Sequence, residues 1–220
     1  MCSLLVGDYC DIDFADASGM NAMNLKTKQW IDNDILLNFI DDQNLKLKLG
    51  NPVESYSIAG TLHNYFTTKY NFPKNCTVIN FSGDNPCSLA GMRMKIGDIA
   101  ISLGTSDTMF APLIDPNPSN EGHVFCDPVH PSHYMALLCF KNGSLVRQHI
   151  SDSVTFSTND WLKFNHLLSL TPPGNDGNLG FYFLQTEITP KIASGFYKFN
   201  SKDDQVENFE KEGSHMYIKI

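Results

Sequence analysis

Hydrophobic and polar positions in the first seventy residues follow a helical rhythm. Apolar side chains recur at helical spacing over residues 29–39 and again over residues 55–70, so the pattern predicts a helix in each segment. Residues 16–20 are rich in small and polar side chains and are typical of a turn. Ser18 or Asn21 is available there to cap whatever follows.

A buried strand and another helix follow. The short apolar run at 77–81 comes directly after a polar turn at 71–75, which predicts a strand. Residues 87–94 again have the spacing of a helix.

The pattern changes near residue 97, after which strands, proline-containing loops and turns dominate. Residues 99–103 and 108–110 flank a tight turn at 104–107, which indicates a hairpin. Further on, the sequence predicts a strand at 134–140, a turn at 141–144, a helix at 161–170 and a loop at 172–180. We therefore expect a domain boundary between Ile96 and Gly97, giving domains 1–96 and 97–220.

Composition and charge narrow the class of protein. The chain has 220 residues, of which 42% are hydrophobic and 18% charged, as in globular proteins. No apolar run approaches the roughly 18 residues of a membrane helix, and the first ten residues do not resemble a signal peptide. We therefore expect a cytoplasmic protein without a membrane partner. The net charge of −8 and a total of two arginines argue against a nucleic-acid partner. They do not argue against ATP, whose phosphates backbone amides and Mg²⁺ can hold.

Cysteine and histidine raise the question of a metal. The six cysteines show no C-x-x-C spacing, so we expect reduced thiols. Four potential zinc ligands fall within eleven residues: His123, Cys126, His130 and His133. Their spacing fits no common zinc pattern and two prolines interrupt it, so we expect an ordinary loop and no metal site.

Asp84 is the strongest candidate for chemistry. It follows the predicted strand at 77–81, and open α/β folds place their ligands at the carboxyl ends of strands. A carboxylate there could take a proton from a hydroxyl, and Asn85 could hydrogen-bond a hydroxylated ligand. Taken alone, residues 83–86 are explained better by an ordinary turn.

The turn at 104–106 is a second candidate. Its backbone amides and the hydroxyls of Thr105 and Ser106 could hold phosphate oxygens. The G-x-x-x-x-G-K-[ST] pattern of a P-loop is absent, and an ordinary hairpin turn explains these residues better when they are considered alone.

Considered together, the two loops are more specific. Residues 81–92 (FSGDNPCSLAGM) followed by 97–108 (GDIAISLGTSDT) closely resemble the FGGY carbohydrate kinases, most of all the animal-type xylulose kinases. Residues 11–13, 16–21 and 134–145 resemble the same subfamily, so the resemblance runs from about Asp11 to about Asn200.

The resemblance implies a function and a fold. Asp84 matches the catalytic base, Asn85 a sugar-binding residue, Gly104, Thr105 and Ser106 a phosphate-facing hairpin, and Trp161 a nucleotide-contacting residue. The implied reaction is phosphorylation of D-xylulose by ATP with Mg²⁺, giving D-xylulose 5-phosphate. The implied fold is an α/β, actin-like (ribonuclease H-like) ATPase of two domains. Residues 1–96 would end the first domain and residues 97–220 would begin the second.

The sequence also departs from the family. The Asp-x-Gly-Thr phosphate loop and the Gly-Gly adenosine loop do not occur here, and residues 211–220 leave the family pattern. We therefore expect a partial chain with little or no activity by itself. Two alternatives stay open: a non-catalytic, kinase-derived interaction or regulatory module, and a kinase for another ketose or polyol. The oligomeric state is open too.

Overall fold

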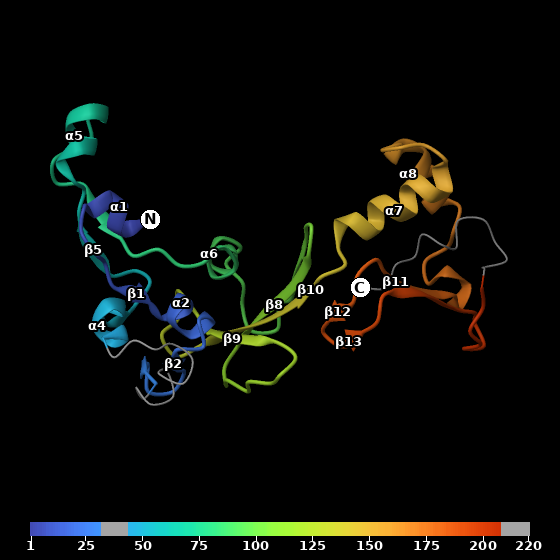
Figure 1. Cartoon of the computed structure of the whole chain (residues 1–220), viewed down its shortest axis with the longest axis horizontal. Helices are drawn as coiled ribbons and strands as arrows, with labels where there is room; N and C mark the ends of the chain where they lie inside the picture. The colour runs from blue at the N-terminus through green and yellow to red at the C-terminus, as the bar shows by residue number, and fades with distance from the viewer. Residues whose placement is uncertain (32–43, 208–220) are drawn as a thin grey trace. The chain divides into compact units, whose positions relative to one another are not determined.

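The computed structural model describes residues 1–31 and 44–207, which divide into two compact units (Figure 1). The first unit comprises Met1–Ala100 and Phe110–Leu137, and the second comprises Ile101–Met109 and Leu138–Ile220. Each unit thus draws on two separate stretches of the chain. The predicted boundary between residues 96 and 97 stays a prediction.

The first unit begins with small elements around Asp13. Helix α1 is Cys2–Val6, strand β1 is Ile12–Asp13, helix α2 is Phe14–Gly19, strands β2 and β3 are Met23–Asn24 and Gln29–Trp30, helix α4 is Leu45–Leu49, and strand β4 is Pro52–Val53. Strand β1 pairs in parallel with β4, and Asp13 caps α2 by accepting a hydrogen bond from the Asp16 amide. The predicted turn at 16–20 is therefore wrong, because Asp13 nucleates a helix there. The helix predicted over 29–39 is wrong at Gln29 and Trp30, and residues 32–39 lie outside the described part of the chain.

A strand–helix–strand segment follows. Strand β5 is Ile58–Thr61, helix α5 is Asn64–Tyr70 and strand β6 is Thr77–Ile79. The strand predicted at 77–81 is confirmed, but the helix predicted over 55–70 forms only from Asn64. Residues 58–61 instead pair antiparallel with β6, so a tertiary pairing outweighs the local helical spacing. Cys2, Leu62 and Val78 form the core beneath them.

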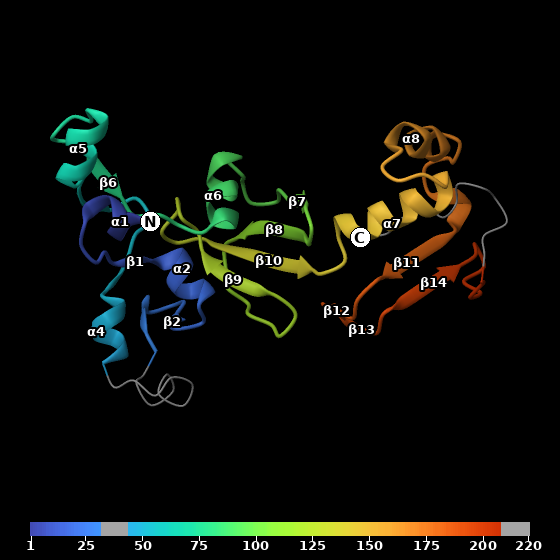
Figure 2. The same cartoon turned by 45° about the horizontal axis from the view of Figure 1, so that its top comes forward.

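The hairpin predicted around residues 104–107 is confirmed within a four-stranded sheet of order β7-β8-β10-β9 (Figure 2). Its strands are β7 Ala100–Leu103, β8 Asp107–Leu113, β9 His123–Cys126 and β10 Tyr134–Phe140. Strand β10 has the predicted bounds and runs antiparallel to β9. Before β7, helix α6 occupies Asp84–Gly91, which starts earlier than the predicted 87–94.

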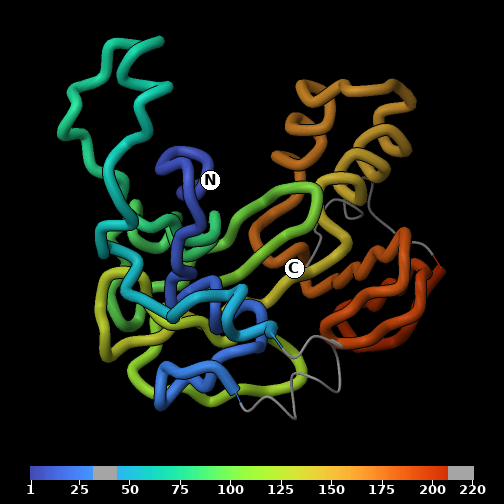
Figure 3. The backbone as a smooth tube through the Cα atoms, turned by 60° about the vertical axis from the view of Figure 1, so that its left-hand side comes forward, coloured from blue at the N-terminus to red at the C-terminus, as the bar shows by residue number. Residues whose placement is uncertain are grey.

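The second unit packs two helices near a two-stranded ribbon (Figure 3). Helix α7 is Ser144–Thr155, α8 is Trp161–Ser169, the 3₁₀ turn η1 is Asn175–Gly177, and the strands are β11 Leu179–Phe183, β12 Glu187–Ile188, β13 Lys191–Ile192 and β14 Gly195–Phe199. Val146, Ile150, Phe164 and Tyr182 form the core that joins α7, α8 and β11. The helix predicted at 161–170 is confirmed, whereas α7 was not predicted. No helix within residues 1–31 and 44–207 is long and apolar enough to cross a bilayer.

Candidate functional site

Asp84 lies where β6 gives way to α6. Gly83 is the N-cap of α6, so Asp84 is its first helical residue and is exposed to solvent. Its Oδ1 accepts hydrogen bonds from the Asn85 backbone amide at 2.9 Å and from the Asn85 side-chain amide at 3.3 Å. A carboxylate at a helix N-terminus is stabilised by the helix dipole. The predicted residues, the exposed Asp84 and the half-buried Asn85, are thus hydrogen-bonded to each other after the end of a strand.

Buried polar groups lie in the segment that leads to Asp84. The Asn80 backbone and side-chain amides donate to the carbonyl and hydroxyl oxygens of Ser57, at 2.9 and 3.0 Å. Asn80 Oδ1 and Ser82 Oγ are buried and have no hydrogen-bond partner among the described residues. Buried polar atoms are normally paired, so these two oxygens offer unused hydrogen-bonding capacity to water or a ligand.

Asp16 is a second carboxylate near Asp84, and its position there was not predicted. A Cβ at Gly83 would lie 2.9 Å from Asp16 Oδ1, so this carboxylate fills the place of a side chain directly before Asp84. Asp16 is exposed as a residue, but partial burial of its carboxylate raises its pKa. The negative charges of Asp13 and Asp84 raise this pKa further, and a hydrogen bond from the Gly83 backbone lowers it. Asp13 itself is buried and also accepts a hydrogen bond from Ser55 Oγ.

The turn at 104–106 belongs to the second unit, where it contacts the start of α7. The Ser144 amide donates to the Gly104 carbonyl at 2.8 Å. A Cβ at Gly143 would lie 2.6 Å from the Thr105 carbonyl oxygen and 2.7 Å from that of Gly104. These two carbonyls therefore face α7, while Thr105 and Ser106 are exposed.

A buried ion pair fixes the end of this turn. Arg147 on α7 binds both carboxylate oxygens of Asp107, with Nη1 to Oδ2 at 2.6 Å and Nη2 to Oδ1 at 3.1 Å. Arg147 Nη2 also reaches the Gly104 carbonyl at 3.4 Å. The Asp107 side chain is 1% exposed and that of Arg147 is 24% exposed. This bidentate geometry orients the hairpin relative to α7.

Trp161, the predicted nucleotide contact, is the first residue of α8 and is 40% exposed. Its ring meets Phe164 edge to face, with centroids 5.5 Å apart. Asp160 caps the helix by accepting from the Lys163 amide at 2.9 Å. Trp161 shares the second unit with the 104–106 turn, while Asp84 and Asn85 lie in the first.

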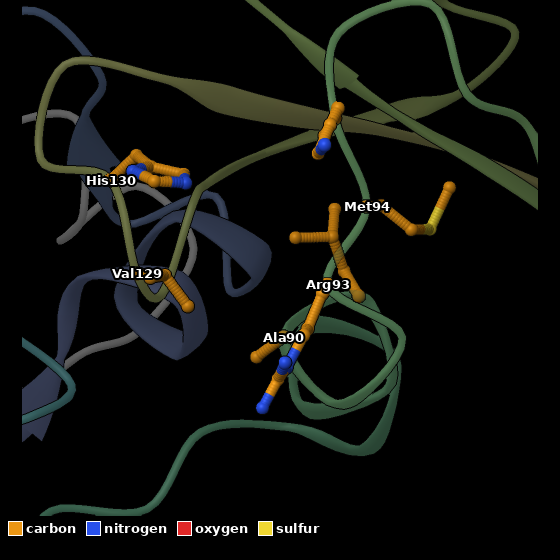
Figure 4. Close-up of a pocket in the computed structure, with 7 residues that line it drawn as sticks. Ala90, Arg93, Met94, Val129 and His130 are labelled. Carbon is orange, nitrogen blue, oxygen red and sulfur yellow. The ribbon is translucent and has the colours of Figure 1, made fainter.

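The described chain also has a pocket of about 250 Å³ in the first unit, between the end of α6 and the loop after β9 (Figure 4). It is lined by Leu89, Ala90, Arg93, Met94, Lys95, Val129 and His130. Figure 4 shows that the Arg93 and His130 side chains extend in different directions, so their nitrogens do not converge on one ligand position. None of the predicted site residues lines this pocket.

The loop predicted around the histidines and cysteine is wrong at His123 and Cys126, because both residues lie in strand β9, which pairs with β10. Cys126 is buried and its amide donates to Ser18 Oγ at 2.9 Å. Asp127 holds the turn that follows, accepting from the amides of Val129 and His130. Within residues 1–31 and 44–207, no group of three or more His, Cys, Asp or Glu side chains could hold a metal ion.

The close approach at Gly143 gives a first prediction. We expect Gly143→Ala to lower the free energy of unfolding by about 1–3 kcal/mol, because the new methyl group would press on three backbone atoms. Gly91→Ala is the matched control, since no described atom lies within 4 Å of its added Cβ. Urea denaturation measures both, and equal stabilities for the two variants would show that the helix start yields to the methyl group.

Comparison with known proteins shows what the chain is similar to. No protein-family model matches the chain. Over 207 residues, 94% of the chain, it is 51% identical to a xylulose kinase of Mus musculus, and it is 43% identical over 213 residues, 96% of the chain, to xylulose kinase 2 of Arabidopsis thaliana. It is 34% identical over 218 residues, 93% of the chain, to a xylulose kinase of Saccharomyces cerevisiae. The chain spans 36% of the length of each of these relatives.

Solved structures agree on the fold. The ligand-bound xylulose kinase of Lactobacillus acidophilus matches 97% of the chain with a TM-score of 0.76 and 19% identity, and the chain covers 42% of that protein. The glycerol kinase of Plasmodium falciparum with ADP matches 98% of the chain with a TM-score of 0.68 and 13% identity, and 41% of that protein is covered. The fold is thus part of the α/β, actin-like ATPase fold of the sugar kinases. In sequence the chain is similar to about a third of a xylulose kinase, and in fold it is similar to part of the FGGY sugar kinases.

Proposed function

We propose that this chain is part of an ATP-dependent sugar kinase that converts D-xylulose to D-xylulose 5-phosphate, with Asp84 as the catalytic base. The observation that carries the proposal is the exposed Asp84 at the start of α6, after strand β6, with its hydrogen bond from the half-buried Asn85. The 51% identity to the mouse xylulose kinase supports D-xylulose as the acceptor. A cytoplasmic location, where ATP is available, is part of the same proposal.

The chemistry needs one proton acceptor on the sugar side. Asp84 accepts the proton of the reacting sugar hydroxyl as that oxygen attacks the γ-phosphorus of Mg²⁺-bound ATP. The new bond joins the sugar oxygen to phosphorus, the bond from phosphorus to the β–γ bridging oxygen breaks, and ADP leaves. Asn85 holds Asp84 Oδ1 through its side-chain amide, and its carbonyl oxygen can accept a hydrogen bond from a second sugar hydroxyl.

The nucleotide side of the proposal lies in the second unit. We assign phosphate contact to the backbone amides of Gly104, Thr105 and Ser106 and to the two hydroxyls, which are exposed. The exposed ring of Trp161 offers a surface on which adenine can stack. The adenosine contacts of a complete kinase include a Gly-Gly loop that these 220 residues lack, so we expect the chain by itself to turn over little or no substrate.

A segment exchange tests this function. In this experiment, the matched segment of the mouse xylulose kinase is replaced by the corresponding 207 residues of this chain. We call the resulting protein the exchanged kinase. We expect ADP release from this protein to depend on D-xylulose, and the 220-residue chain assayed alongside to give none. An exchanged kinase that folds but releases no ADP above background would overturn the proposal.

Sugar selectivity separates the proposal from its main alternative. We expect D-xylulose to give the highest kcat/KM of a panel that includes other ketoses and polyols. A preference for another member of the panel would keep the kinase but change its acceptor. A folded exchanged kinase that is inactive with every acceptor would favour the non-catalytic alternative instead.

The raised pKa of Asp16 gives a prediction for stability. Its folded-state pKa lies above the ordinary 3.8, so the folded chain binds this proton more tightly than the unfolded chain does. The wild type therefore loses stability as the pH rises from 3.8 through the folded pKa, and Asp16→Asn escapes this loss. We expect the difference in unfolding free energy, variant minus wild type, to increase between pH 4 and pH 7 in urea titrations. A difference that stays constant or decreases would contradict the carboxylate crowding around Asp84.

A further inference from the structure

Glu187 is a buried carboxylate that the catalytic proposal does not use. Its side chain is in the second unit, and the residue is 3% exposed. Oε1 accepts from the amides of Lys141 and Ile188, both at 2.8 Å, and Oε2 accepts from the Asn142 backbone and side-chain amides at 3.2 and 2.9 Å. Burial alone would raise its pKa, but these four hydrogen bonds outweigh burial and lower the pKa of Glu187. The carboxylate is therefore charged at neutral pH and held by four N–H donors.

Asn142 strengthens the same link. Its side-chain amide donates to the Gln185 carbonyl at 2.9 Å, and its Oδ1 accepts from the Gln185 amide at 3.1 Å. The side chains of Glu187 and Asn142 thus join residues 141 and 142 to the segment 185–188. The two segments lie more than forty positions apart in sequence.

The next two residues after Asn142 touch the candidate phosphate turn. Gly143 packs against the carbonyls of Gly104 and Thr105 so closely that a Cβ has no room, and the Ser144 amide donates to the Gly104 carbonyl at 2.8 Å. The position of Gly143 and Ser144 is set on one side by α7 and on the other by the peptide that Glu187 holds. A continuous set of contacts therefore runs from Glu187 to the turn at 104–106.

We infer that Glu187 is a positioning residue for the phosphate turn: its carboxylate fixes residues 141–143, which in turn fix the backbone of Gly104 and Thr105. The meaning of this link for catalysis rests on the proposed function, in which the turn contacts ATP. Positioning matters there because a small displacement of phosphate contacts slows transfer severely. Glu187 makes no contact with substrate in this scheme.

Hydrogen exchange on the full 220-residue chain tests the structural link without any activity. The reporter is the Ser144 amide, which bonds Gly104, and the reference is the Phe164 amide, which bonds Asp160 at 3.0 Å within the same unit. In Glu187→Gln, an amide NH₂ replaces one oxygen and meets N–H donors, so we expect Ser144 exchange to accelerate at least about tenfold with Phe164 unchanged. Glu121→Gln, an exposed glutamate in the other unit, is the matched control.

Each outcome is decisive. Unchanged Ser144 exchange would overturn the inference. If the exchange rates of both amides rise equally in Glu187→Gln, the same two rates are measured in Glu187→Asp, because this variant keeps the charge and shortens the side chain. Local acceleration in that variant supports the inference, and an equal effect at both amides overturns it.

Kinetics of the exchanged kinase then test the role in catalysis. We expect Glu187→Gln to raise KM for ATP about tenfold while KM for D-xylulose stays unchanged. An equal increase in both KM values would contradict a role confined to the phosphate turn, and so would two unchanged KM values. If the exchanged kinase without the variant releases no ADP, the proposed function fails, while the exchange experiment still decides whether Glu187 organises the turn.

Discussion

Asp84→Asn is expected to lower kcat of the exchanged kinase by about 10²–10⁴-fold, the usual contribution of a general base. The substitution keeps the shape of the side chain but removes its ability to take up a proton. The hydrogen bond from the Asn85 amide to Oδ1 at 2.9 Å can persist, so we expect the fold and the sugar site to stay intact. Initial rates of ADP release at saturating D-xylulose and ATP measure the effect.

The matched control is Asp8→Asn in the same unit. Asp8 is exposed, and its Oδ1 accepts from the adjacent Tyr9 amide at 2.7 Å, much as Asp84 accepts from Asn85. We expect no change in kcat for this variant. A similar decrease in both variants, or a decrease of less than about tenfold in Asp84→Asn, would argue against a proton-accepting role for Asp84.

Arg147→Met is expected to have the largest effect on stability, a loss of about 3–5 kcal/mol in the free energy of unfolding. Arg147 binds both oxygens of Asp107, whose side chain is 1% exposed, so its removal leaves a buried and uncompensated charge. Urea denaturation of the 220-residue chain, followed by a probe in the second unit such as Trp161 fluorescence, measures the loss.

Two further variants test the reason for that loss. Asp107→Asn combined with Arg147→Met removes the stranded charge, so the double variant should be more stable than Arg147→Met alone. Lys202→Met, at an exposed lysine in the same unit, should change stability by no more than about 0.5 kcal/mol. A loss below 1 kcal/mol in Arg147→Met would mean that water solvates Asp107 once the arginine is gone.

Local sequence signals predicted those elements of the candidate site that are built by neighbours in the chain. Strand β6, the loop before Asp84 and the start of α6 follow one another within fifteen residues, and glycine and proline mark this stretch. The hairpin around 104–106 and strand β10 are equally local. The helix predicted over 55–70 was wrong in its first part for a non-local reason, since residues 58–61 pair with β6, while residues 64–70 do form a helix.

The supports of the site could not be predicted because their contacts are distant in sequence. Asp107 and Arg147 lie 40 positions apart, and Glu187 and Lys141 lie 46 apart. Neither pair has a spacing that distinguishes it from ordinary surface charges. Asp16 reaches Gly83 across a still longer separation in sequence, and residues 16–20 resembled a simple turn. Arg147 was set apart in the sequence only because the chain has just two arginines.

The most direct test of the central claim is the product formed by the exchanged kinase from D-xylulose and ATP, identified by mass spectrometry. We predict a xylulose monophosphate in amounts equal to the ADP released when residue 84 is aspartate, and almost none when it is asparagine. Equal yields of the phosphorylated sugar from the two proteins would contradict the assignment of Asp84 as the base.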